Sequence, residues 1–361
     1  MIHDAERRRE ANDFADRDFI RRVLIVLALA ALAYLVWQLS EVLLLVFGAV
    51  VVAVVLRSCA DLIARRTPIP RRWSLIVAGL AILLLFAGIS VVLGTRLRAQ
   101  LAQLLALLPP AIEYVFGEFG VTSVTQEIPR VLGSGLGGSV LSHIASLGIT
   151  AVSALTNLFL VMVAGTFLAV DPKLYQTGLV KLFPQSLHER VDSALNASGR
   201  ALELWLVGQL FAMALIGVLV GFAMWLIGLP SPLALGLIAG LTEFIPFIGP
   251  ILGALPALLI AATRDAGTLA WTVIAFVGIQ QIESNLIMPV IQRRTVSLPP
   301  VLSLFAVVAF GVVLGALGLI LAVPLTVVAY VLVKKLYVRE TLGEPTSVPG
   351  ENAKAEAAEP S

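Results

Sequence analysis

The segment Leu229-Pro-Ser-Pro-Leu233 opens a pattern that this chain carries twice. In the first copy an apolar run leads to Glu243-Phe-Ile-Pro-Phe-Ile-Gly-Pro250, and the second copy runs from Leu298-Pro-Pro-Val-Leu302 to Leu314-Gly-Ala-Leu-Gly318. Leu229, Pro230 and Gly249 match Leu298, Pro299 and Gly318 at a constant offset of 69 positions. Repeated apolar segments with glycine and proline breaks indicate the binding region of a secondary transporter, because the breaks free backbone groups inside the membrane.

The composition is that of an integral membrane protein. Hydrophobic residues make up 59% of the chain and charged residues only 13%, with a mean hydropathy of +0.97. Several uncharged runs are as long as the roughly 20 residues that cross a membrane as a helix. We therefore predict an all-α polytopic fold. The single cysteine, Cys59, excludes an intrachain disulfide.

Arginine placement predicts the topology of the N-terminal part. The basic segment 1–22 is expected in the cytoplasm, followed by a retained membrane helix rather than a cleaved signal. Membrane helices then fill 23–170, with an external connection at 38–41, an arginine-rich cytoplasmic loop at 57–72 and an amphipathic insert at 95–146. This part is expected to act as scaffold and oligomerisation region.

A mixed-charge segment, 171–203, follows and is predicted to be a cytoplasmic amphipathic helix. Ser186 and Glu189 have the spacing of a capping box at its start. The helix is expected to continue directly into a spanning helix at 204–229. At the other end of the chain, the polar tail 336–361 is predicted to be disordered and cytoplasmic, so both termini lie on one side.

The repeat itself has lengths that do not fit simple spans. Residues 232–262 would form a helix of about 46 Å, too long for one crossing of a core roughly 30 Å thick, whereas each half is too short. Two re-entrant hairpins that enter from opposite sides fit these lengths and keep the cations near 293 in the cytoplasm. We thus predict about six spanning helices plus two hairpins, with 204–335 as an inverted-repeat transport unit whose tips meet at the midplane. A plain eight-span arrangement is the alternative.

Polar residues near the helix breaks are the candidate site. Glu243 lies beside the first break, and Gln281, Glu283 and Asn285 lie close together before Pro289. Ionisable groups at membrane depth indicate function, although Glu243 has the alternative of capping a half-helix and the others of bonding between helices. The remaining substrate- or ion-binding candidates are Phe247, Gly249, Gly315 and Gly318. Hairpin-shaping roles are predicted for Pro246, Pro250, Pro256, Pro289 and Pro324. Gly217 and Gly221, with Gly236 and Gly240, form small-xxx-small pairs that predict close helix packing.

Segments 243–250, 283–289 and 315–324 resemble, in order and spacing, the signatures of the autoinducer-2 exporter family of bacterial transporters, also called PerM-like permeases. The resemblance covers about 20–335. It implies a homo-pentamer in the bacterial cytoplasmic membrane, which exports a small polar solute such as the furanosyl signal molecule. Some relatives resemble sodium/proton antiporters. Many members carry a histidine where this chain has Pro299, so a role for that histidine is not expected here.

Other classes of protein fit the sequence less well. The chain has no Gly-x-x-x-x-Gly-Lys-Ser/Thr loop for ATP and no His-Glu-x-x-His motif for metal-dependent hydrolysis. The glycine run 133–138 follows no predicted strand, so it does not indicate a nucleotide site. The histidines do not cluster, which argues against a metal site. A pentameric channel is a further alternative, but a channel should show regular polar rings on a pore helix, whereas the polar residues here lie at helix breaks. We predict a transporter without enzymatic activity, cofactor or nucleic-acid partner, with a proton or sodium as possible coupling ion.

Overall fold

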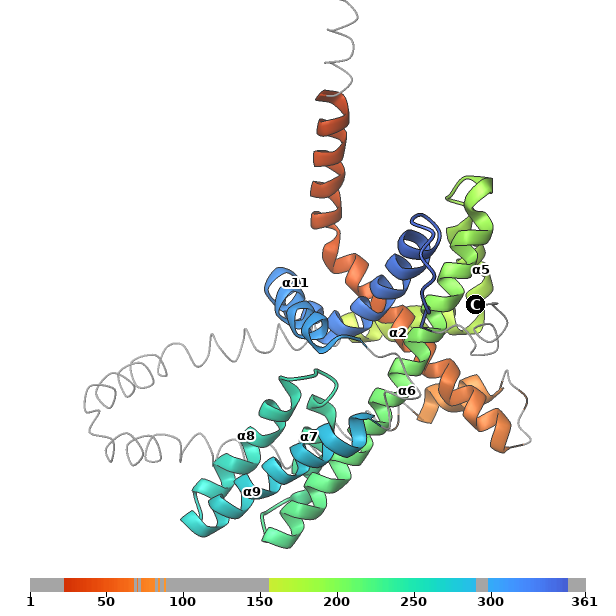
Figure 1. Cartoon of the computed structure of the whole chain (residues 1–361). Coiled ribbons are helices and arrows are strands. Elements are labelled where there is room, and N and C mark those ends of the chain that lie inside the picture. The colour runs from red at the N-terminus through yellow and green to blue at the C-terminus, as the bar shows by residue number, and fades with distance from the viewer. Residues whose placement is uncertain are drawn as a thin grey trace, which may run out of the picture.

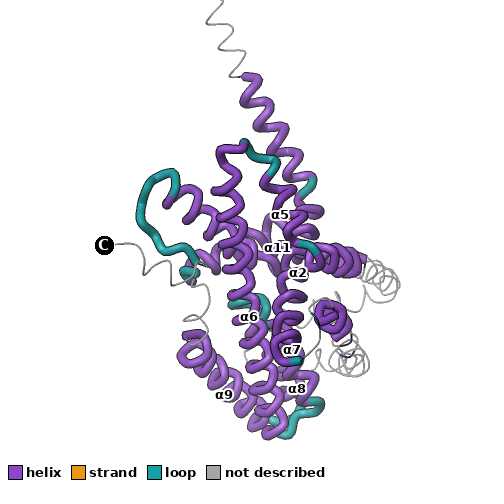
Figure 2. Tube along the Cα trace, turned by 90° about the vertical axis from the view of Figure 1, so that its right-hand side faces the viewer, coloured by secondary structure: helices purple, strands orange, loops and turns teal. Residues whose placement is uncertain are grey.

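The computed structural model describes residues 23–67, 70, 73–81, 84, 88, 156–289 and 298–349. All regular elements in those ranges are helices joined by short loops, as Figure 2 shows. The predicted all-α fold is therefore confirmed for the described residues. The amphipathic insert 95–146 and the basic segment 1–22 lie outside them.

The described N-terminal part begins with two helices separated by a turn at Leu39. A helix at Val23–Gln38 is followed by α2, Ser40–Arg66. The helical hydrogen bonds run through the junction, from Leu39 N to Leu35 O and from Leu43 N to Leu39 O. The turn at Leu39 falls within the predicted connection 38–41, and its external location stays a prediction.

Residues 73–81 are also helical, and the segment described from 156 onward leads into the longest of the described helices. A helix at Thr156–Val170 bends by 87° into α5, Pro172–Val180, whose N-terminus is capped by the carboxylate of Asp171. A short 3₁₀ turn, η1 (Gln185–Leu187), precedes α6, His188–Ile227. The continuous helix across 204 is as predicted. The capping box is wrong: Ser186 lies within η1, and α6 starts after Leu187 without a side-chain cap.

The first repeat is a pair of half-length helices. These are α7, Pro232–Thr242, and α8, Gly249–Ala262, and they are followed by α9, Ala266–Ile282, and a π-helical turn, η2, at Glu283–Ile287. With 11 and 14 residues, α7 and α8 are about 16 and 21 Å long, so neither crosses a membrane alone. Figure 1 shows α6, α7, α8 and α9 side by side in one bundle.

The glycine pairs let α6 and α7 approach backbone to backbone. An added Cβ at Gly240 would lie 2.6 Å from the Met213 carbonyl oxygen and 3.1 Å from Gly217 Cα. An added Cβ at Gly236 would overlap the Gly217 carbonyl oxygen and lie 2.8 Å from Gly221 Cα. The pairs run in opposite chain directions, so α7 is antiparallel to α6. This confirms the predicted packing role of the four glycines.

The second repeat, α11 (Pro300–Leu332), is also broken. Gly315 has φ +68° and ψ −152°, a backbone conformation open only to glycine, and the helix axis turns there. Gly318 then lies against the carbonyl oxygen of Phe310. A second π-helical segment, η3 (Val333–Arg339), continues the chain. The break falls inside the predicted tip, Leu314–Gly318.

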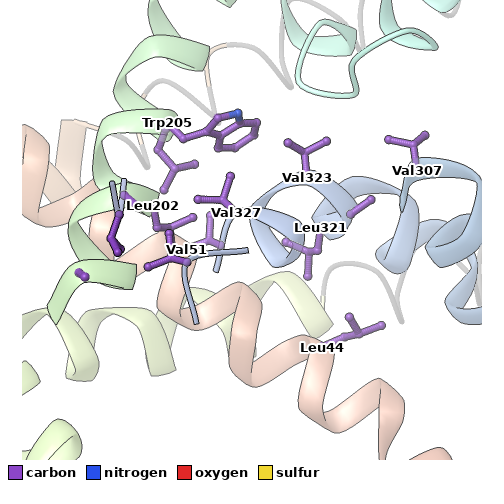
Figure 3. Packing of buried hydrophobic residues seen from close by; sticks show 14 residues of the cluster. Leu44, Val51, Leu202, Trp205, Val307, Leu321, Val323 and Val327 are labelled. Atoms are coloured by element: carbon purple, nitrogen blue, oxygen red, sulfur yellow. The ribbon is translucent and has the colours of Figure 1, made fainter. Parts of the chain in front are cut away.

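Two apolar clusters hold the described helices together, and α6 takes part in both. The first joins α2, the first half of α6 and α11, including Val51, Trp205, Val307 and Val327 (Figure 3). The second joins the other half of α6 to α7, α8 and α9. Phe244 and Ile248 of the first tip pack on the first cluster, as do Phe310 and Leu314 beside the second break. Direct contact between the two tips stays a prediction.

Three of the described helices are long and apolar enough to cross a membrane: α2, the helix that contains α6, and the one that contains α11. A fourth follows if the bent pair Thr156–Val170 and α5 counts as one span. A multi-pass membrane protein is indicated.

The start of the C-terminal tail is packed. The Lys334 ammonium donates to the Ser347 carbonyl oxygen at 3.0 Å, and Arg190 pairs with Glu340 at 3.1 Å. Val348 is only 5% exposed and belongs to the first cluster. The tail predicted as disordered thus begins with an ordered stretch to 349, and residues 350–361 lie outside the described ones.

We expect Gly240→Ala to destabilise the α6–α7 pair, because its methyl group would overlap the Met213 carbonyl. The apparent melting temperature in detergent should fall by several degrees, about the effect of 1–3 kcal/mol from overpacking. Gly278→Ala is the matched control, since a Cβ there meets nothing within 4 Å. Equal melting temperatures for the two variants would contradict the close contact.

The α8–α9 loop gives a pH-dependent prediction. Hydrogen bonds from the Thr268 hydroxyl and amide lower the pKa of Asp265, which caps α9. A carboxylate with a lowered pKa stabilises the fold above its unfolded pKa, and this contribution is lost as the pH falls through the folded value. Asp265→Ala should thus melt below wild type at pH 7, and the difference should shrink below about pH 4. A constant difference from pH 7 to pH 3 would exclude the ionised cap.

Candidate functional site

The first hairpin tip is a strained turn. Residues 243–248 connect α7 to α8, and Phe247 in this turn has φ +69°, which is uncommon for a residue other than glycine. Its ring is 44% exposed. Pro246 lies in the same turn, and Pro250 occupies the first turn of α8, where a proline removes no helical hydrogen bond. Such strain gathers at functional sites.

Gly249 closes the hairpin, and its predicted ligand-binding role stays a prediction. A Cβ at this position would overlap the Thr242 carbonyl oxygen and approach Glu243 Cα at 2.8 Å. One turn later, Gly253 lies against Ala239. The start of α8 is thereby pressed onto the end of α7, and this fixes where the tip residues stand.

Glu243 is the first residue of the turn and is only 3% exposed. Its main-chain carbonyl oxygen accepts a hydrogen bond of 2.7 Å from the side-chain amide of Gln209 on α6. Beside it, the Phe244 ring packs edge-to-face on Trp205, with 6.0 Å between ring centroids. Glu243 does not cap α8, whose N-terminus has no side-chain cap, so that alternative is excluded here.

Glu283 lies opposite Glu243. It begins the π-helical turn η2 and is 4% exposed. It shares a helical face with Ile279 and Ile287, which are buried in the second apolar cluster. A π-helical turn inside a helix is rare and is frequent at functional sites.

The two buried carboxyl groups contact each other through a side-chain hydrogen bond. Two ionised carboxylates are acceptors only, so this bond requires a proton on one of them. The Gln280 amide donates to Glu283 Oε2 at 2.9 Å, so the Glu283 carboxyl group has a second hydrogen-bond partner beside Glu243. The arrangement can hold and release a proton within the helix bundle.

The other polar candidates on this helix face away from the pair. Asn285 Nδ2 donates to Gln281 Oε1 at 3.1 Å, so the two side chains share a face as expected from their spacing. Both are exposed, and they satisfy each other rather than Glu243 or Glu283. The structure therefore brings Glu243 and Glu283 together and leaves Gln281 and Asn285 outside that contact.

The remaining candidates occupy several places. Gly315 and Gly318 form the break in α11, and no hydrogen bond among the described residues joins that break to the carboxyl pair. Pro256 lies inside α8 and Pro324 inside α11, rather than at a tip. Pro289 is exposed at the end of the described part of its helix.

Gln209 is a residue that the sequence reasoning passed over. A detectable signal existed, because it is the single side-chain amide in the uncharged run 204–227 of α6. A lone hydrogen-bonding group in an apolar helix needs a partner inside the protein. Its partner, the Glu243 carbonyl, becomes evident only from the fold.

No group of three or more His, Cys, Asp or Glu side chains with metal-binding proximity occurs in the described part of the chain. A recess of about 650 Å³ lies between α2, residues 73–81 and the helix Thr156–Val170. Its lining is mostly apolar and includes none of the candidate residues.

Comparison with known proteins gives consistent matches. The model of the AI-2E family transporter matches residues 24–338. YrrI of Bacillus subtilis is 37% identical over 166 residues, which cover 46% of this chain and 47% of YrrI, so this chain spans about half the length of that relative. YueF of the same organism is 26% identical over 298 residues, covering 74% of this chain and 76% of YueF.

A third relative, MT0215 of Mycobacterium tuberculosis, is 32% identical over 151 residues, 40% of each chain. Each of the three is named for transport, with no substrate in its name. The family match covers both repeats and the helices that precede them, including both members of the buried carboxyl pair. This chain belongs to the AI-2E family of membrane transporters.

Proposed function

We propose that this protein is a secondary transporter that exports a small polar solute, such as autoinducer-2, by alternating access. The observation that carries the proposal is the buried Glu243–Glu283 pair, placed where a broken helix hairpin meets a π-helical turn. An ionisable pair buried among apolar helices is expensive and is expected to serve transport rather than stability. Residues 204–335 are the proposed transport unit.

The proposed movement follows from the two breaks. The hairpin α7–α8 and the bent α11 both pack near Trp205, so one solute site between them can be covered from either side. Movement of this unit against the helices of 23–170 would expose the site alternately, an elevator-like motion. The helices of 23–170 would also form the contacts of a homo-pentamer in the bacterial cytoplasmic membrane, with both termini in the cytoplasm.

Sodium/proton antiport is the second candidate, and the carboxyl pair favours it specifically. A pair that releases its proton becomes a site of negative charge that a sodium ion can neutralise. Proteoliposomes separate the two functions. A sodium gradient that moves protons without any added solute indicates antiport, whereas efflux of autoinducer-2 driven by an imposed proton gradient indicates solute export.

Glu243→Gln and Glu283→Gln should each lower the initial transport rate about tenfold or more, the effect of losing a hydrogen bond to a charged group. The rate should also lose its dependence on the imposed proton gradient, because a glutamine does not exchange a proton. Glu189→Gln, an exposed change in the first turn of α6, is the matched control. Near-normal coupled transport in both site variants, with unchanged assembly on size exclusion, would refute the assignment.

If the proposed hairpin topology holds, residue 264 is outside the cell and residue 293 is in the cytoplasm. Single cysteines at these positions, introduced into a Cys59→Ser background, should react with a membrane-impermeant maleimide from opposite sides in right-side-out and inverted vesicles. The reason is that α9 then crosses once between them. Reaction of both from one side would restore the eight-span arrangement and remove the inverted repeat.

A further inference from the structure

One stripe of α6 makes close contacts with α7 and its tip, where Glu243 lies. The stripe advances by four residues at a time, through Trp205, Gln209, Met213, Gly217 and Gly221, and so stays on one face of the helix. At its glycine end the contact is main chain against main chain: Gly217 meets Gly236, and a Cβ on Gly221 would lie 3.4 Å from the Pro232 carbonyl oxygen. Because the two main chains touch here, these contacts hold α7 in register along α6.

At the tip end of the stripe the contacts are of another kind. The Phe244 ring meets Trp205 edge-on, and the Gln209 amide donates to the Glu243 carbonyl oxygen at 2.7 Å. Each is one contact between a side chain and the turn. A single hydrogen bond and a ring contact can break and reform without unpacking the helices, unlike the glycine contacts beyond them.

The Glu243 carbonyl needs this donor. It stands at the C-terminus of α7, where the last carbonyl groups of a helix have no partner within the helix. The residue is buried, so an unpaired carbonyl there would carry a full desolvation cost. Gln209 is 6% exposed and uncharged, and it supplies the hydrogen bond without adding a charge beside the carboxyl pair.

The bond also orients the carboxyl group of the same residue. Gln209 holds the main chain of Glu243. The Glu243 side chain contacts the carboxyl group of Glu283, which accepts a hydrogen bond from the Gln280 amide. A chain of hydrogen bonds thus links α6, the tip and the end of α9. Within the described part of the protein, the charged group that acts on Glu243 is Glu283 alone, and Gln209 and Gln280 are its uncharged polar neighbours from α6 and α9.

We propose that Gln209 is a positioning residue of the transport site: its amide holds the tip against α6 so that Glu243 faces Glu283, and the tip swings about the glycine contacts when this bond breaks. The inference rests on the proposed function for its link to transport. The position of the tip itself can be tested without any transport.

The first experiment measures the tip directly in the full-length protein. Ile245→Cys in a Cys59→Ser background reports the tip through its rate of modification by N-ethylmaleimide. Gln209→Leu removes the donor at similar size, and Gln209→Asn keeps an amide that is too short to reach. Both should raise the rate roughly fivefold, the population change expected when one neutral hydrogen bond is lost. Ser198→Ala is the matched control, a buried change on α6 at a hydroxyl without a hydrogen-bond partner.

The second experiment tests positioning through a pH profile. The carboxyl group introduced by Gln209→Glu can donate to the Glu243 carbonyl only while it is protonated. The ratio of its proton-driven transport rate to that of wild type should thus be near one at acidic pH and fall as the pH rises. Gln209→Leu should give a low ratio at every pH, since leucine has no donor to restore.

Several results would overturn the proposal. An unchanged modification rate in both Gln209→Leu and Gln209→Asn would show that the bond does not hold the tip. A faster rate combined with a flat pH ratio for Gln209→Glu would reduce Gln209 to a packing residue. If wild-type protein moved neither autoinducer-2 nor sodium and protons, the proposed function would fail, and the modification rates would still decide whether Gln209 holds the tip.

Discussion

The backbone contact between α6 and α7 is the interaction on which the rest of the described architecture depends. Glycines on both helices remove the side chains that would otherwise keep the axes 8–10 Å apart. The contact fixes the register of the hairpin along α6, so that its tip lies level with Trp205 and Gln209. That register then decides which part of α9 the tip faces. A buried carboxyl pair thus exists because two helices can approach at their glycines several turns away.

The sequence predicts most of what depends on local chemistry. Glycine and proline inside apolar runs predicted the breaks near 243–250 and 314–318, because both residue types disfavour a continuous helix. In the second break Gly315 adopts a non-helical backbone conformation with φ +68°. The expected continuation of the helix 171–203 into 204–229 is seen as the unbroken α6. Half-span lengths predicted that α7 and α8 are separate helices. These are properties of the chain within a few residues.

Features that depend on distant contacts were not predictable in the same way. Glu243 and Glu283 were both recognised as candidates, but their pairing needs the hairpin to fold back along α6. Gln209 becomes informative only when the Glu243 carbonyl is seen to lack a helical partner. The wrong prediction is a local one: Ser186 lies in a 3₁₀ turn instead of capping α6. The segment before α6 has the residue spacing of a helix cap, but its backbone forms the 3₁₀ turn η1.

The position of Glu283 separates a functional role from a structural one. It lies between Ile279 and Ile287 on the buried face of its helix, where an aliphatic side chain would pack without any desolvation cost. Replacing buried charged groups by apolar ones of similar volume is often neutral or stabilising, so stability alone gives no reason for a carboxyl group there. The same holds for Glu243 at the tip. When both carboxyl groups are ionised, their mutual repulsion raises the free-energy cost of burying each one. Two carboxyl groups facing each other in an apolar bundle are consistent with a site whose protonation has to change, and the amides of Gln209 and Gln280 are placed to keep the pair aligned while it does.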